Sequence, residues 1–294
     1  MIIVRVVGES SCGVRLNVVD MTAFDVPLDE GTAKKLRRVL LDLAAGMDSF
    51  VKRGSIPCPF NKEPLNRQYV TTASLLLEIL TAADYVRALG KLVAEPKITV
   101  SIHAVARSVI ECLGRGHWVA TAADKPQATL RAFLFLHKEV QEASKSAIYQ
   151  SSLGEKEMTS EEYKAKLLEV INDLGGWSEV PGLTRLSVDL LTAAYPDFPE
   201  EDCRRKYQEL CAGTHGNFSV IGLYGTSDTS LRLPRLIALN VVGSVIGCAL
   251  FAVRSISQAP TGLFKENAIV DLWEPVQLRI IPILTSMSSQ DSPL

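Results

Sequence analysis

The sequence predicts a mainly α-helical protein with a small β-hairpin at its start. Two observations lead to this fold class. From residue 29 onward, apolar residues recur at helical spacing, and the helices they predict cover far more than the one third that is usual in globular proteins. Runs of β-branched residues, which favour strands, stand at the start of the chain, within the first twenty residues.

The first residues predict a hairpin, because residues 2–7 and 14–19 are β-branched runs separated by a glycine- and serine-containing turn. We assign residues 1–22 to this hairpin and expect it to lean on the helical body, since an isolated hairpin is only marginally stable. Residues 23–285 are expected to form one helical domain. The polar residues 286–294 are expected to be a disordered tail.

Local signals give the helix ends. Asp29 suits the start of the first helix, and Pro126 suits the first turn of another. Thr159 and Glu162 have the spacing of a capping box. Helices are expected over about residues 31–50, 66–94, 99–122, 126–149, 159–174, 183–194, 200–212, from near 217, 234–257 and 269–280. The segment 151–158 is expected to be a polar break.

The composition favours a globular protein of the cytoplasm. Hydrophobic residues make up 47% and charged residues 22% of the 294 residues, and the net charge of -2 gives no overall attraction for nucleic acid or anionic lipid. The six cysteines form no CxxC pair and no cluster with zinc-ligand spacing, which indicates reduced structural thiols and no metal or other cofactor. The first residues are too short an apolar run for a signal peptide.

The charge-free segment 236–253 has two interpretations. Its length and the spacing of Gly243 and Gly247 are typical of a membrane-spanning helix. Asn240 and Ser244 interrupt it, however, and it lacks flanking aromatic residues. A buried central helix of a bundle explains the segment better, so no membrane association is expected.

A polar stripe marks the third predicted helix, where His103, Arg107 and Glu111 are spaced four residues apart and therefore share one face. One interpretation is an exposed face with an intrahelical ion pair of a few tenths of a kcal/mol. The other is a partly buried pair that lines a cleft and serves anion binding or acid–base chemistry. We favour the exposed face.

A second candidate is His215, which follows a predicted helix and stands between Thr214 and Gly216. Histidine is the side chain that most readily transfers protons near neutral pH. In the structural alternative, which we favour, its ring caps helix carbonyls or hydrogen-bonds Tyr207 or Thr214.

These two segments carry a family resemblance. The stretch from Arg107 to Glu111 resembles the Arg-x-x-x-Glu helix of uncharacterised bacterial families related to the HEPN-like superfamily. Residues 180–184, followed by residues 207–216, resemble the second half of that pattern, a Pro-x-x-Thr segment and a Tyr-x-x-Leu-Ser-x-x-x-His-Gly segment. Cys211 stands where serine is usual. The resemblance covers about residues 98–225.

The resemblance implies a HEPN-like helical bundle in which Arg107, Glu111 and His215 approach one another. Some superfamily members are metal-independent RNases of toxin–antitoxin and phage-defence systems. Their signature is an arginine followed by a histidine after four to six residues, with a polar residue next to the arginine. Arg131 and His137 match that spacing, but Ala132 fails the polar requirement.

Three function classes remain open. We favour an interaction or sensor protein, in a defence or stress context, that forms a homodimer or larger homo-oligomer and binds a protein or RNA. The second class is an RNase or toxin in which His215 is the acid–base group, Arg107 stabilises phosphate charge and Glu111 holds Arg107 in place. The third class binds a nucleotide or another small molecule. Weaker binding candidates are His103, Tyr207, Arg131 and His137.

The densest basic cluster is formed by Lys34, Lys35, Arg37 and Arg38 in the first predicted helix. Such a cluster is usually a solvated helix face. It is also the first place to look for contacts with phosphate groups.

Overall fold

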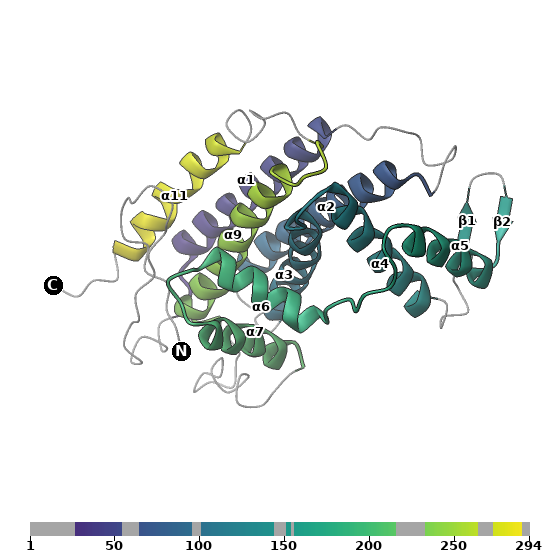
Figure 1. The fold of residues 1–294 in the computed structure, drawn as a ribbon. Coiled ribbons are helices and arrows are strands. Elements are labelled where there is room, and N and C mark those ends of the chain that lie inside the picture. Colours follow the sequence, from purple (N-terminus) through teal and green to yellow (C-terminus); the bar gives the residue numbers. More distant parts are fainter. Residues whose placement is uncertain are drawn as a thin grey trace.

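The described part of the chain is mainly α-helical, as predicted. The computed structural model describes residues 27–54, 65–95, 101–143, 151–153, 156–215, 233–263 and 273–289 (Figure 1). The hairpin predicted for residues 1–22 and the helix predicted to begin near residue 217 lie outside these ranges, so both stay predictions.

Apart from the ends of α4 and α11, the described helices begin and end close to the positions that local signals predicted. They are α1 (Glu30–Arg53), α2 (Arg67–Val93), α3 (Ser101–Ala120), α4 (Lys125–Ala143), α5 (Ser160–Asp173), α6 (Leu183–Ala194), α7 (Glu200–Thr214), α9 (Arg235–Ser257) and α11 (Glu274–Ser289). The Asp29 carboxylate accepts a hydrogen bond from the backbone N–H of Thr32 at the start of α1. Thr159 and Glu162 form the predicted capping box of α5, with both reciprocal hydrogen bonds.

Two stretches differ from the prediction. The expected polar break at residues 151–158 contains a short antiparallel ribbon of β1 (Ser151–Leu153) and β2 (Lys156–Met158). In the paired strands, backbone N–H and C=O groups hydrogen-bond to each other, whereas in a coil they would hydrogen-bond to water. Helix α11 continues to Ser289 across Pro282, beyond the predicted end at about residue 280.

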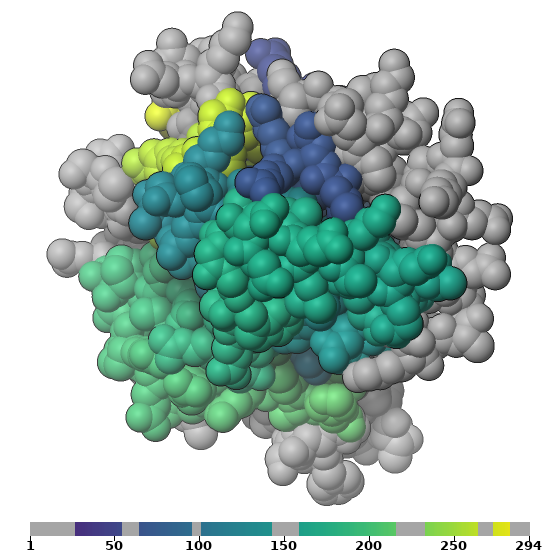
Figure 2. All heavy atoms as spheres, turned by 45° about the vertical axis from the view of Figure 1, so that its right-hand side comes forward, coloured from purple at the N-terminus to yellow at the C-terminus, as the bar shows by residue number. Residues whose placement is uncertain are grey.

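Helix α3 is the central helix of the bundle. It packs against α2, α6, α7 and α9, and α2 in turn packs against α1 (Figure 1). One continuous apolar core runs through these helices, and α4 and α5 extend it beyond α2. Figure 2 turns the side with α4 and α5 toward the reader. In this view α5 and the segment after it lie at the front of the molecule, with α2 above them and α6 and α7 below. Helix α3 therefore presents its successive faces to different partner helices.

Helix α9 is a buried helix of this bundle. Within the described residues it is the one helix that is long and apolar enough to cross a membrane. Of its most apolar stretch of 18 residues, 67% is buried inside the protein. The glycine spacing has a local explanation: the Tyr195 hydroxyl, from the end of α6, donates a 2.8 Å hydrogen bond to the Gly243 carbonyl oxygen. A Cβ atom at Gly247 would lie 2.1 Å from that same hydroxyl oxygen.

Candidate functional site

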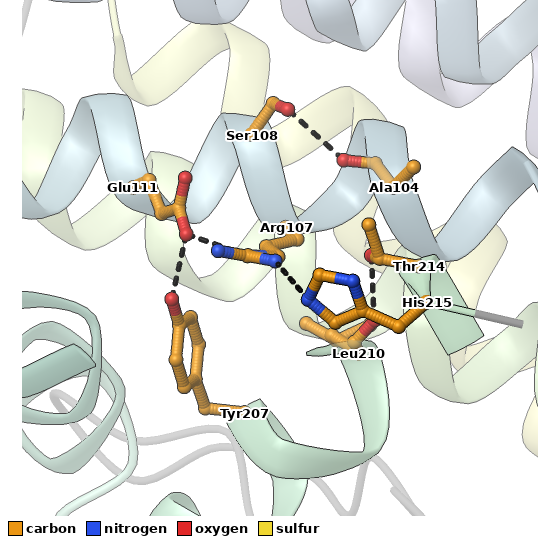
Figure 3. A network of polar contacts seen from close by, with 8 residues as sticks. All are labelled: Ala104, Arg107, Ser108, Glu111, Tyr207, Leu210, Thr214 and His215. Carbon is orange, nitrogen blue, oxygen red and sulfur yellow. Dashed lines mark hydrogen bonds and ion pairs between the residues drawn. The ribbon is translucent and has the colours of Figure 1, made fainter. Parts of the chain in front are cut away.

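The three catalytic candidates lie together where α7 crosses α3 (Figure 3). Arg107 and Glu111 project from α3, and His215 is the residue that follows α7. Tyr207, one of the weaker candidates, belongs to the same cluster and comes from the middle of α7. We call these four residues the Arg107 cluster.

Glu111 is the hub of the Arg107 cluster. Its Oε1 atom accepts a 2.6 Å hydrogen bond from Nε of Arg107 and a 2.6 Å hydrogen bond from the Tyr207 hydroxyl. The side chain of Arg107 is 25% exposed and that of Glu111 is 15% exposed. The favoured prediction of an exposed ion pair is therefore wrong, because α7 covers this face of α3 and Tyr207 adds a third member.

His215 turns its ring toward Arg107. The residue is exposed, and its Nε2 atom lies 3.4 Å from Nη1 of Arg107. Because a guanidinium can only donate, a hydrogen bond here requires the lone pair of Nε2 and places the ring proton on Nδ1. Among the described residues, the ring makes no hydrogen bond to Tyr207 or Thr214, the two side chains that the structural alternative names. The Tyr207 hydroxyl donates to Glu111, and the Thr214 hydroxyl donates to the Leu210 carbonyl.

The charge states of Arg107 and Tyr207 are fixed by contacts within the cluster. Burial acts to lower the pKa of Arg107, but the hydrogen bond and negative charge of Glu111 outweigh it and raise that pKa above its ordinary value. Burial raises the pKa of Tyr207, and the hydrogen bond to Glu111 raises it further. The guanidinium therefore stays charged and the phenol stays protonated near neutral pH.

The close approach of α3 and α7 depends on Gly213, two residues before His215. A Cβ atom at this position would lie 2.4 Å from Cγ of His103, far inside van der Waals contact. His103 is 5% exposed and fills the space beneath the glycine. The structure thus gives His103 a packing position next to the Arg107 cluster, one helical turn from Arg107, and does not expose it to a ligand.

Burial of His103 predicts a pH effect on stability. Burial lowers the pKa of His103 from 6.5 to about 4, so the unfolded chain takes up this proton first. The contribution of His103 to the free energy of unfolding is therefore complete above pH 6.5 and is lost as the pH falls through the interval from 6.5 to 4. Between pH 7 and pH 4.5 the expected loss is about 2 kcal/mol.

Urea unfolding at several pH values measures this loss. Wild-type protein is expected to lose about 2 kcal/mol more over that interval than a His103→Leu variant, in which the titrating group is absent. The other histidines with lowered pKa values, His117 and His137, are common to both proteins and cancel in the comparison. Parallel stability profiles would contradict a buried neutral His103.

Arg131 and His137, the pair with RNase-signature spacing, are engaged at different places. The Arg131 guanidinium lies over the Trp118 ring, 4.9 Å from its centroid, and donates a hydrogen bond to the Trp118 carbonyl oxygen at the end of α3. His137 is buried, with its ring edge-on to Trp177 at a centroid distance of 5.1 Å. Each residue thus has a local packing role, and neither contacts the Arg107 cluster in the described part of the chain.

A second partly buried ion pair joins α2 and α3 and was missed in the sequence. Arg115 donates two hydrogen bonds to Glu78, of 2.7 and 2.8 Å, and burial raises the pKa of Glu78 despite this partner. The two residues stand 37 positions apart, so no local spacing signals the contact. The two hydrogen bonds of this pair fix α2 against α3, one helical turn along α3 from Glu111.

The described residues contain no cluster of three or more histidine, cysteine, aspartate or glutamate side chains that could hold a metal ion. Four cysteines in these ranges are free thiols, and Cys112 and Cys248 are buried, as predicted from their apolar surroundings. Burial raises the pKa of Cys112 to about 12, which makes it unreactive as a nucleophile.

Comparison with known proteins adds no relative. The chain matches no protein-family model, no curated protein and no solved structure. The relationship to the HEPN-like superfamily therefore rests on the resemblance of the sequence motifs and stays a prediction.

Proposed function

We propose that the protein cleaves RNA at the Arg107 cluster. The observation that carries the proposal is the pairing of an exposed histidine with a fixed cation: Nε2 of His215 lies 3.4 Å from Nη1 of Arg107, whose Nε is held by Glu111. A proton acceptor beside a permanent positive charge is what phosphodiester cleavage needs. Arg107 and Glu111 are also only partly buried, so a phosphate group can reach the guanidinium.

The chemistry divides among the four side chains. A ribose 2′-hydroxyl displaces Nη1 of Arg107 from the Nε2 lone pair of His215 and gives its proton to Nε2, and the oxygen attacks the adjacent phosphorus atom. The bond from phosphorus to the 5′-oxygen breaks, and that oxygen takes a proton from the histidine or from water. The products are a 2′,3′-cyclic phosphate and a 5′-hydroxyl. Arg107 faces the negative charge that develops on the phosphate oxygens, while Glu111 and Tyr207 hold Arg107 in position.

The other two function classes find less support. An exposed apolar patch would support the interaction or sensor hypothesis, but most of the apolar helix α9 is buried. The nucleotide or small-molecule hypothesis shares the Arg107 cluster, since a phosphate-bearing ligand would use the same guanidinium. Only the RNase hypothesis uses both the accessible histidine and the arginine. Self-association, a role in defence or stress and a cytoplasmic location stay predictions.

A cleavage assay tests the proposal. Purified wild-type protein is incubated with end-labelled single-stranded and hairpin RNAs, with and without EDTA, beside His215→Ala and Arg107→Ala variants. The cleavage rate is expected to fall by at least about 100-fold in either variant, because an acid–base group alone contributes about that much. Circular dichroism checks that each variant is folded.

The matched control is Arg185→Ala, which removes an arginine that is also paired to a carboxylate four residues away, but with a side chain that is 56% exposed. This variant is expected to cut at the wild-type rate. Absence of cleavage by wild-type protein on every RNA, or equal cleavage by wild type and His215→Ala, would overturn the proposal.

A further inference from the structure

We propose that a second surface, formed by α1 and the end of α2, binds the phosphate backbone of an RNA strand. We call it the basic face and define it by Lys34, Lys35, Arg37 and Arg38 of α1 with Lys91 of α2. The inference rests on the proposed function only in naming RNA as the polyanion.

Helix α1 separates its apolar and basic residues completely over this stretch. Leu36, Val39 and Leu40 are fully buried in the core, whereas the four basic residues between and beside them are exposed. Lys34 makes an ion pair with Glu30, and its side chain is 73% exposed. Among the described residues, Lys35, Arg37 and Arg38 form no ion pair, so their charges face solvent.

Lys91 joins the basic face because α1 and α2 are antiparallel and packed closely. A Cβ atom at Gly90 would lie 3.4 Å from Cβ of Leu40 and 3.6 Å from the carbonyl oxygen of Arg37. Lys91 follows this contact and is exposed. Two helices thus contribute cations to one region of the surface.

Acidic residues near the basic face do not cancel its charge. Glu30 is paired with Lys34, Asp42 is half-buried four residues after Arg38, and Glu95 is exposed four residues after Lys91. The charge of Arg87, one turn before Lys91 on α2, is neutralised by Asp48, so Arg87 does not belong to the basic face. Five basic residues therefore stand beside three acidic ones in a chain whose net charge is -2. Such a local excess attracts polyanions although the whole protein does not.

The arrangement fits a phosphate backbone better than a lipid surface. A helix that lies on a membrane inserts a broad apolar face and places its basic residues at the edges. The apolar face of α1 is already packed into the bundle, and Leu41 is the large apolar side chain exposed beside the basic residues, at 37%. Lysine and arginine side chains on a helix without an exposed apolar face bind phosphate groups, and such contacts do not depend on the base sequence.

Binding at the basic face is separate from chemistry at the Arg107 cluster. The basic face belongs to α1 and α2, whereas the Arg107 cluster belongs to α3 and α7. Helix α9 lies between α1 and α7 in the bundle (Figure 1). Substitutions on the basic face therefore leave the Arg107 cluster intact, and the two roles can be tested one at a time.

Fluorescence anisotropy with a labelled single-stranded RNA tests the inference. The full chain carries His215→Ala so that the probe is not cut during the measurement. A triple variant, Lys35→Gln, Arg37→Gln and Arg38→Gln, is compared with a control triple variant, Lys52→Gln, Arg53→Gln and Lys166→Gln. The control residues are also exposed and the change in net charge is the same.

The basic-face variant is expected to bind at least about 10-fold more weakly at 0.1 M salt, and the control less than about 3-fold more weakly. The slope of log affinity against log salt concentration is expected to become shallower by about 2 for three lost phosphate contacts on a single strand. Equal affinities of the two variants would overturn the inference, even if the protein cuts RNA.

Two further experiments distinguish RNA binding at the basic face from lipid binding and from the proposed catalytic site. Phosphatidylcholine vesicles with and without phosphatidylserine are offered to the same variants, and binding of anionic vesicles without RNA binding would reassign the basic face to lipid. Cleavage that survives His215→Ala and Arg107→Ala, together with RNA binding that depends on the basic face, would overturn the proposed catalytic site and support this inference.

Discussion

Replacing Gly247 by alanine is expected to lower the free energy of unfolding by about 3 kcal/mol, measured by urea denaturation. Glycine to alanine inside a helix ordinarily stabilises by about 1 kcal/mol. At this position the added Cβ atom would lie 2.1 Å from the Tyr195 hydroxyl oxygen and 2.5 Å from Cζ of that ring. The clash falls between α6 and α9, inside the core, where overpacking costs about 1 to 3 kcal/mol or more.

The substitution also threatens a hydrogen bond. Tyr195 is 7% exposed and donates to the Gly243 carbonyl oxygen, so a displaced ring leaves a buried hydroxyl without a partner. In a Tyr195→Ala background the clash is absent, and Gly247→Ala is expected to cost less than about 1 kcal/mol. The difference between the two backgrounds is the coupling energy of the pair.

Gly90→Ala provides the matched control. Gly90 also lies inside a long helix, but a Cβ atom there would come no closer than 3.4 Å to a neighbouring atom, which is ordinary contact. This variant is expected to be as stable as wild type or more stable. A Gly247→Ala protein with wild-type stability would show that α6 does not dock on α9 through Tyr195.

The helix pattern could be predicted because it depends on signals a few residues apart. Asn66 accepts a hydrogen bond from the backbone N–H of Tyr69 and begins α2, and Leu183 and Ala194 bound α6 at the predicted positions. The ribbon at residues 151–158 was missed because its stability comes from pairing, which composition does not announce. The sequence also did not show why residue 247 is glycine, because Tyr195, which packs against it, is 52 positions away in the sequence.

The candidate site could be predicted in part. The four-residue spacing placed Arg107 and Glu111 on one face of α3, the position of His215 after a helix made it a candidate, and the motif resemblance implied that the three residues approach one another. Whether that face was exposed depended on α7, which crosses α3 about a hundred positions later in the chain. The close crossing uses Gly213 against His103, a contact that neither local spacing nor the motif contains.

Replacing Glu111 by alanine is expected to lower the free energy of unfolding by about 2 kcal/mol. The change leaves the partly buried Arg107 guanidinium and the hydroxyl of the buried Tyr207 without their shared acceptor. Removing one partner of a fully buried ion pair costs about 3 to 5 kcal/mol, and the partial exposure of Arg107 reduces that cost. Urea denaturation at pH 7 measures the change.

Asp189→Ala is the matched control for this stability effect. Asp189 accepts a 2.8 Å hydrogen bond from Nε of Arg185 four residues earlier, the same geometry as in the Arg107 and Glu111 pair, but both side chains are more than one third exposed. The expected change is within about 0.5 kcal/mol. Equal costs at Glu111 and Asp189 would mean that α7 does not bury the Arg107 cluster.

Glu111→Gln distinguishes a role of Glu111 in catalysis from a purely structural role. The amide oxygen can still accept from Tyr207, so the loss of stability is expected to be about 1 kcal/mol, smaller than in Glu111→Ala. The negative charge that orients Arg107 is gone, however, and kcat for RNA cleavage is expected to fall at least about 10-fold while KM changes little. A merely structural Glu111 would lower stability and leave kcat unchanged. A fall in kcat that exceeds the loss of folded protein would therefore identify Glu111 as the residue that positions Arg107 for the transition state.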